Sequence, residues 1–98
     1  MTYIPTGTTL TDYEREALVI LMEECAEVIQ AASKLIRFGK ENRPDNGISN
    51  TETLSLEAGD LRYMLTVIRD LELTDEETEI KGQQRKHDRI RWYMQSKR

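Results

Sequence analysis

The sequence predicts an all-α protein, an antiparallel bundle of about three helices that is completed by self-association. Three patterns of Ser or Thr followed three residues later by Glu, at Thr11, Ser49 and Thr74, are typical of capping boxes. Apolar residues follow each pattern at helical spacing, and no segment alternates convincingly between polar and apolar residues as a strand would. With 98 residues, the chain is expected to form one domain, residues 1–98.

The first helix is expected over residues 12–38 and ends before Gly39. Its core-facing stripe is expected to contain residues that recur at steps of three and four: Leu18, Leu21, Cys25, Val28, Ala32 and Leu35. On this stripe Cys25 is interpreted as a buried thiol. A loop rich in Asn, Pro, Asp and Gly follows. The second helix is predicted over residues 50–71 and the third over residues 75–95, with Gly82 as a weak point.

Charge is unevenly distributed along the chain, whose net charge is −4. Residues 1–80 carry 17 acidic and 7 basic side chains, whereas residues 81–98 carry 1 acidic and 7 basic side chains. Most of the chain would repel a polyanion such as DNA, so nucleic-acid binding is disfavoured and would depend on the last segment. No membrane span or secretory signal is recognisable, and the single cysteine favours a reducing, cytoplasmic location.

Acidic residues occur where the helical pattern calls for apolar ones. Glu57 and Asp60 fall inside the apolar arc of the second helix. Such carboxylates are protonated, paired with a cation such as Arg62, or bound to a metal. On the first helix, Glu23 and its neighbours Glu24 and Glu27 form an E-E-x-x-E pattern without a Lys or Arg at i+4.

A divalent cation would balance these acidic groups if the two helices pack together. Ligand sets made only of oxygen select hard ions such as Mg²⁺ or Mn²⁺. Iron is less favoured, because di-iron bundles use Glu-x-x-His pairs and the single histidine, His87, follows Gln84 at that spacing.

The ordered pair of motifs, E-E-x-x-E at residues 23–27 and E-x-x-D at residues 57–60, resembles that of MazG-like all-α nucleoside triphosphate pyrophosphohydrolases, especially small single-domain members of phage type. The resemblance covers residues 17–72. It implies hydrolysis of a nucleoside triphosphate, with a deoxynucleotide as the expected substrate, between the α and β phosphates to a monophosphate and pyrophosphate. It also implies Mg²⁺ or Mn²⁺ held by Glu24, Glu27, Glu57 and Asp60. Glu23 is then a further ligand or orients the attacking water, and either Glu23 or Glu24 serves as the base.

Substrate-binding residues are expected among basic and aromatic side chains. Lys81, Arg85 and Arg89 form one basic edge of the third helix, which suits a polyphosphate, the acidic face or simply solvent. Lys34 and Arg37 are alternatives. Base recognition is expected from aromatic or amide side chains, which otherwise serve in the core or in turns. These candidates are Phe38, Tyr63, Trp92, Asn42, Asn46 and Asn50.

A three-helix chain of this size has a small core, so a homo-oligomer, a dimer or a tetramer, is expected, with the site near a subunit interface. Two other functions remain open on the sequence. One is a small helical regulatory or nucleic-acid-binding protein that uses its basic C-terminal helix. The other is a metal-binding or nucleotide-binding module without turnover.

Overall fold

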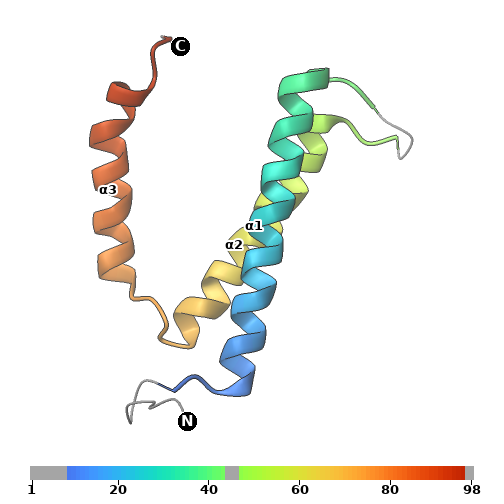
Figure 1. Ribbon diagram of the computed structural model, residues 1–98. Helices are drawn as coiled ribbons and strands as arrows, with labels where there is room; N and C mark the ends of the chain where they lie inside the picture. Colours follow the sequence, from blue (N-terminus) through green and yellow to red (C-terminus); the bar gives the residue numbers. More distant parts are fainter. Residues whose placement is uncertain (1–8, 44–46, 97–98) are drawn as a thin grey trace, which may run out of the picture.

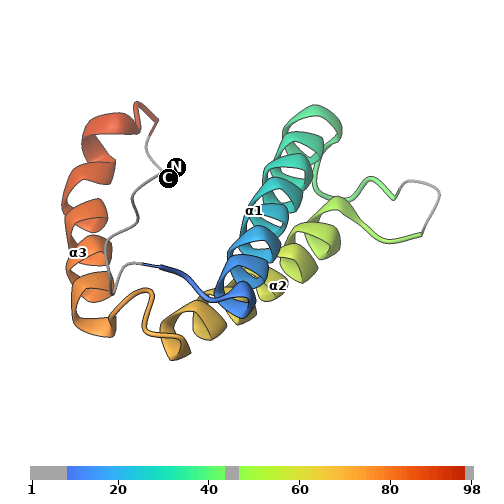
Figure 2. The same cartoon turned by 60° about the horizontal axis from the view of Figure 1, so that its bottom comes forward.

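The computed structural model describes residues 9–43 and 47–96. These residues form three helices and no strand: α1 (Asp12–Phe38), α2 (Asn50–Asp70) and α3 (Glu76–Tyr93). The predicted all-helical class is confirmed, and every predicted helix end lies within two residues of the observed one. α1 and α2 run antiparallel as a hairpin, whereas α3 stands apart from the hairpin in both views (Figures 1 and 2).

The helices begin where side-chain oxygens satisfy free backbone N–H groups. Thr11 and Glu14 form the predicted capping box of α1, and the Ser49 hydroxyl accepts a hydrogen bond from the backbone N–H of Glu52. The prediction for α3 is wrong by one residue, because the carboxylate of Asp75, not the hydroxyl of Thr74, accepts the hydrogen bond from the backbone N–H of Thr78. A carboxylate is the better cap because its charge also complements the positive helix end.

The core lies between α1 and α2. Its buried apolar residues are Ala17, Ala31, Met64 and Ile68. The predicted stripe on α1 is therefore only partly right. Its other members are half-buried, but Cys25 is exposed, and the most buried positions of α1 are two alanines. Alanine has a short side chain, so it lets the facing helix approach closely and becomes buried even where larger apolar residues are available.

Both helices of the hairpin contribute a seam of residues that are spaced alternately by four and three. We call the α1 set the inner seam: Ala17, Leu21, Glu24, Val28, Ala31 and Leu35. The matching seam of α2 consists of Asn50, Leu54, Glu57, Leu61, Met64 and Ile68, and it continues into the C-cap residue Leu71. Every member of the two seams is buried or half-buried. This is the spacing with which two helices pack side by side over several turns.

Polar contacts close the hairpin at its connection. Gly39 adopts φ +87°, a left-handed conformation that glycine permits at a helix end, and its N–H bonds to the carbonyl oxygen of Leu35. The side chain of Asn50 is buried and donates to the Gly39 carbonyl oxygen at 3.0 Å, while its backbone N–H bonds to the carbonyl oxygen of Asn42 at 3.0 Å. These bonds fix where α2 starts relative to the end of α1.

α3 is attached to the hairpin mainly through one ionic contact. The Arg69 guanidinium donates two hydrogen bonds to the Glu79 carboxylate, at 2.6 and 3.2 Å, and the Thr74 hydroxyl donates a third at 2.6 Å. None of the residues of α3, Glu76–Tyr93, is buried. Across the described part of the chain, no helix combines the length and apolar character needed to cross a bilayer.

Acidification is expected to weaken this contact. The pKa of Glu79 is lowered to about 2 because Arg69 and Thr74 hydrogen-bond its carboxylate. A carboxyl group with a lowered pKa in the fold stabilises it above the ordinary value of 4.5, and this contribution is lost as the pH falls from there toward 2. The difference in Tm between the wild type and Glu79→Gln, followed by circular dichroism, should therefore shrink below pH 4.5. Glu77→Gln is the control, and a pH-independent difference for Glu79→Gln would contradict the assignment.

Candidate metal centre

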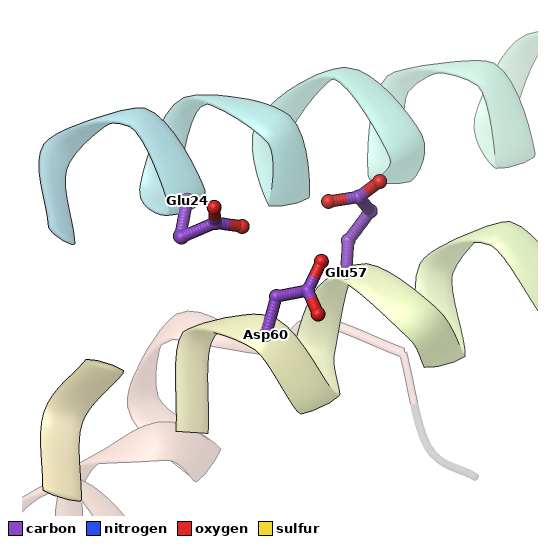
Figure 3. Close-up of side chains that lie close together, drawn as sticks. All are labelled: Glu24, Glu57 and Asp60. Atoms are coloured by element: carbon purple, nitrogen blue, oxygen red, sulfur yellow. The ribbon is translucent and has the colours of Figure 1, made fainter. Parts of the chain in front are cut away.

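Three carboxylates meet where the middle of α1 faces the middle of α2. Glu24 projects from α1 toward α2, and Glu57 and Asp60 project from α2 toward α1 (Figure 3). One carboxylate oxygen of each lies within 4.8 Å of the others. Glu24 and Glu57 are half-buried, and Asp60 is exposed. The site is therefore partly enclosed by the hairpin and open to solvent on the side of Asp60.

Helical register places these side chains together. Glu24 and Glu57 occupy positions of the two seams that would otherwise carry apolar residues, so packing of the hairpin brings them face to face. Asp60 follows Glu57 by three residues and lies on the same side of α2. Of the four predicted metal ligands, these three converge and Glu27 is not among them.

The negative charges of the carboxylates at the centre repel one another. The pKa of Glu24 is raised, first by burial and then by the negative charges of Asp60, Glu57, Glu27 and Glu23, in that order. Every one of these neighbours is a carboxylate. Bringing like charges together in a partly desolvated place disfavours the ionised state, and a cation at the same place relieves the repulsion.

The donor set fits a hard divalent cation. Mg²⁺ takes oxygen ligands at 2.0–2.1 Å, so ligands on opposite sides of the ion are roughly 4.2 Å apart. Three oxygens on one such ion cannot all be opposite one another, since neighbouring ligands are roughly 2.9 Å apart. The three carboxylate oxygens, which lie within 4.8 Å of one another, would therefore have to move closer together to bind one ion. Glu24, Glu57 and Asp60 would hold the ion, and the open side leaves room for water or phosphate oxygens. This arrangement suits Mg²⁺ or Mn²⁺ better than a thiolate-binding or imidazole-binding metal.

The remaining acids of the first motif stand beside the centre. Glu27 and Glu23 are both exposed and are not among the three residues whose oxygens converge. Both still act on Glu24, with Glu27 the stronger of the two. The structure therefore places the predicted ligand Glu27 and the predicted catalytic residue Glu23 at the rim of the centre, on the exposed side of α1.

An apolar groove begins one helical turn from the carboxylates. Ile20 precedes Glu24 by four residues and Met64 follows Asp60 by four, and both line this groove, whose volume is about 170 Å³. Its full lining is Tyr13, Glu16, Ala17, Ile20, Tyr63, Met64 and Val67. Tyr63 was predicted as a base-binding candidate, but Tyr13 and Ile20 were missed. The signal was present, since Tyr13, Ile20 and Glu27 recur every seven residues and so share one side of α1.

The predicted basic residues lie at two places. Lys34 follows Glu27 by seven residues, which puts it on the same side of α1, about 10 Å farther along the axis. Arg37 lies almost one turn beyond, and its guanidinium stacks on the Phe38 ring at 5.1 Å. Lys81, Arg85 and Arg89 are on α3, which stands apart from the hairpin (Figure 1).

The other predicted base-binding residues are distant from the centre or have structural roles. Phe38 is 14 residues past Glu24, roughly 21 Å along α1. Trp92 is exposed near the end of α3, where Arg91 stacks on it. Asn50 is engaged at the hairpin connection, where Asn42 supplies a backbone acceptor. Asn46 lies outside the described residues.

Comparisons of this chain with protein-family models, with curated proteins and with solved structures give no match. The assignment of the centre therefore depends on its own geometry and charge.

Added Mg²⁺ or Mn²⁺ is expected to raise the Tm of the protein, because the ion binds the folded carboxylate cluster and relieves its repulsion. Glu57→Gln should unfold at a higher temperature than the wild type in EDTA, and should lose most of the increase that the metal causes. Thermal unfolding followed by circular dichroism, with and without millimolar metal, measures both effects. Asp70→Asn, at the far end of α2, should respond to metal as the wild type does. An equal metal response in Glu57→Gln would remove the assignment.

Proposed function

We propose that the protein is a metal-dependent nucleoside triphosphate pyrophosphohydrolase of the MazG-like type. The convergence of Glu24, Glu57 and Asp60 within 4.8 Å carries this proposal. It joins the two acidic motifs that resemble this family into one site. A bound Mg²⁺ or Mn²⁺ supplies neutralisation of the phosphate charge and a more acidic water for attack. The products are a nucleoside monophosphate and pyrophosphate.

The three carboxylates of the first motif have separate tasks in this proposal. Glu24 belongs to the converging set and is a ligand. Glu23 is exposed at the rim, so it is the carboxylate left to orient the attacking water and accept its proton. Glu27, which acts on Glu24 more strongly than Glu23 does, supports the ligand set from the same side.

The hairpin orders the parts of a nucleotide along its length. The groove beside Tyr63 receives the base, because aromatic and apolar walls accept a flat ring. The carboxylate centre, one turn farther along, receives the phosphates. Lys34, on the side of α1 that carries Glu27, lies beyond the centre and binds the far end of the triphosphate. This order suits cleavage between the α and β phosphates, which are the phosphates near the middle of the site.

The basic edge of α3 supports two further proposals. A hollow of about 200 Å³ at Gly82 is lined by cations and one tyrosine: Arg85, Lys86, Arg89 and Tyr93. In a homo-oligomer, this basic edge, which carries the predicted residues Lys81, Arg85 and Arg89, would reach the triphosphate bound by another copy. The same hollow favours the second candidate function, in which the protein binds nucleic acid through α3 without turnover.

Incubation with each deoxynucleoside and ribonucleoside triphosphate and Mg²⁺ or Mn²⁺ should yield monophosphate and pyrophosphate. When the reaction is run in water labelled with oxygen-18, attack of water on the α phosphorus places the label in the monophosphate. Glu57→Gln should lower kcat/KM by about 100-fold or more, because it removes a ligand of the centre. Asp70→Asn is the matched control on the same helix and should keep full activity.

Other outcomes of this assay would contradict the proposed reaction or favour another function. Orthophosphate and a diphosphate would show cleavage at a different bond and contradict the proposal. No product, together with salt-sensitive retention of DNA, would favour the nucleic-acid-binding alternative. Metal-dependent nucleotide binding without product would favour a module that lacks turnover.

Tyr63→Ala is expected to raise KM for the preferred nucleotide by about 5-fold to 150-fold, since stacking of a base on an aromatic ring contributes roughly 1–3 kcal/mol. The value of kcat should change little, because Tyr63 lies beside the groove and not among the converging carboxylates. Phe38→Ala removes an exposed ring at the far end of α1 and serves as the control. Steady-state kinetics that show equal effects of the two substitutions would place the base elsewhere.

A further inference from the structure

α1 carries a second seam that the hairpin covers only along one edge. Each of its members follows a member of the inner seam by one residue, which places it about 100° farther around the helix. We call this set the outer seam: Leu18, Met22, Cys25, Ile29, Ala32 and Ile36. It repeats the alternating spacing of four and three that α1 uses against α2. In helices, such a repeat over several turns is typical of packing against another helix.

The outer seam is apolar and largely open to solvent. Met22, Ile29 and Ile36 are 63, 69 and 86% exposed, and Cys25 is exposed. Leu18 and Ala32 are half-buried at the edge of the hairpin. The neighbouring row on the solvent side, Val19, Ala26 and Ser33, is also uncharged. An apolar strip this long, roughly 27 Å from residue 18 to residue 36, is unusual on a free surface.

The rest of the fold gives the hairpin little support of its own. Among the described residues, the buried apolar set is limited to two alanines, Met64 and Ile68. α3 contributes no buried residue. On α3, Ile80 and Ile90 are separated on their side of the helix by Gln83, Gln84 and His87, so α3 has no continuous apolar row to match the outer seam.

We propose that the outer seam pairs with the outer seam of a second copy in an antiparallel, two-fold symmetric contact. A second α1 offers an identical row of apolar residues, so the two rows fit each other along their whole length. A two-fold axis midway along the seam sets Cys25 opposite the second copy's Ile29. It likewise sets Met22 opposite Ala32 and Leu18 opposite Ile36.

Charge decides the direction of pairing. α1 begins with Asp12 and Glu14 in its first turn and ends with Arg37 in its last, followed by Lys40. An antiparallel contact brings the acidic start of one helix to the basic end of the other, and it also opposes the two helix dipoles favourably. A parallel contact would bring like charges together at both ends.

The outer seam is separate from the carboxylate centre on α1. The outer seam lies about 100° around α1 from the inner seam that contains Glu24. Asp60, on the solvent side of the centre, belongs to α2. The paired α1 helices themselves therefore lie away from the inner seam and from the groove beside Tyr63.

Sedimentation equilibrium tests the contact directly. The wild type is expected to show twice the chain mass of 11.4 kDa at micromolar concentration. Ile29→Asp should raise the dimer dissociation constant by about 100-fold or more, since it buries two unpaired carboxylates in the contact. Leu56→Asp makes the same change at an exposed apolar site of α2 and should leave the mass unchanged. Circular dichroism of each variant confirms that helix content is retained. A monomeric wild type would overturn the proposal.

Cysteine pairing tests the direction and does not require a destabilising substitution. Cys25 is the only cysteine, and a disulfide forms only when the two Cα atoms lie within about 7 Å. A chain carrying Cys25→Ser and Ile29→Cys, mixed with the wild type and oxidised, should give a covalent heterodimer. The wild type alone should remain largely uncrosslinked. A chain carrying Cys25→Ser and Ile20→Cys is the control and should not crosslink to the wild type. Rapid crosslinking of the wild type alone would indicate a parallel contact and contradict the proposal.

Discussion

Repulsion among carboxylates at a helix interface is the constraint on which this structure depends. Glu24 and Glu57 occupy seam positions where apolar residues would stabilise the hairpin, and Asp60 adds a third negative charge. The raised pKa of Glu24 reflects the resulting cost, which burial and four acidic neighbours share. Few apolar contacts compensate, chiefly those of Ala17, Met64 and Ile68. Carboxylates at the centre of an interface destabilise the packing of the two helices, and a bound cation would offset their repulsion.

The antiparallel hairpin also gives the centre its surroundings. Because α1 and α2 run in opposite directions, the turn of α1 that precedes Glu24 faces the turn of α2 that follows Asp60. The apolar groove lies at these two turns. In the other direction along α1, the same side of the helix carries Glu27 and then Lys34. The apolar groove, the carboxylate centre and the positively charged side chain of Lys34 therefore follow one another along the hairpin. This order corresponds to the proposed order of base, phosphates and terminal phosphate charge.

α1 resembles a helix built for two neighbours more than a surface helix of a hairpin. Its inner and outer seams are offset by one residue, and together they make more than half of its circumference apolar. α2 covers the inner seam, and the proposed second copy covers the outer one. α3, joined through Arg69 and Glu79, contributes no buried residue to the core. Its cationic hollow offers a surface for anions.

The sequence by itself determined the helices, because capping residues and apolar spacing act within a few residues of each other. It also identified the acids that converge, since Glu24 and Glu57 interrupt apolar rows at recognisable positions. Periodicity could not choose which side of α1 faces α2, because apolar residues surround most of that helix, and so Cys25 was expected in the core and is exposed. Only the tertiary structure decided that the alanines are buried, that Glu23 and Glu27 stand at the rim, and that Tyr13 and Tyr63 share a groove. Such placements depend on how closely two helices approach and on their relative rotation, and these are properties of the packed pair that neither helix encodes alone.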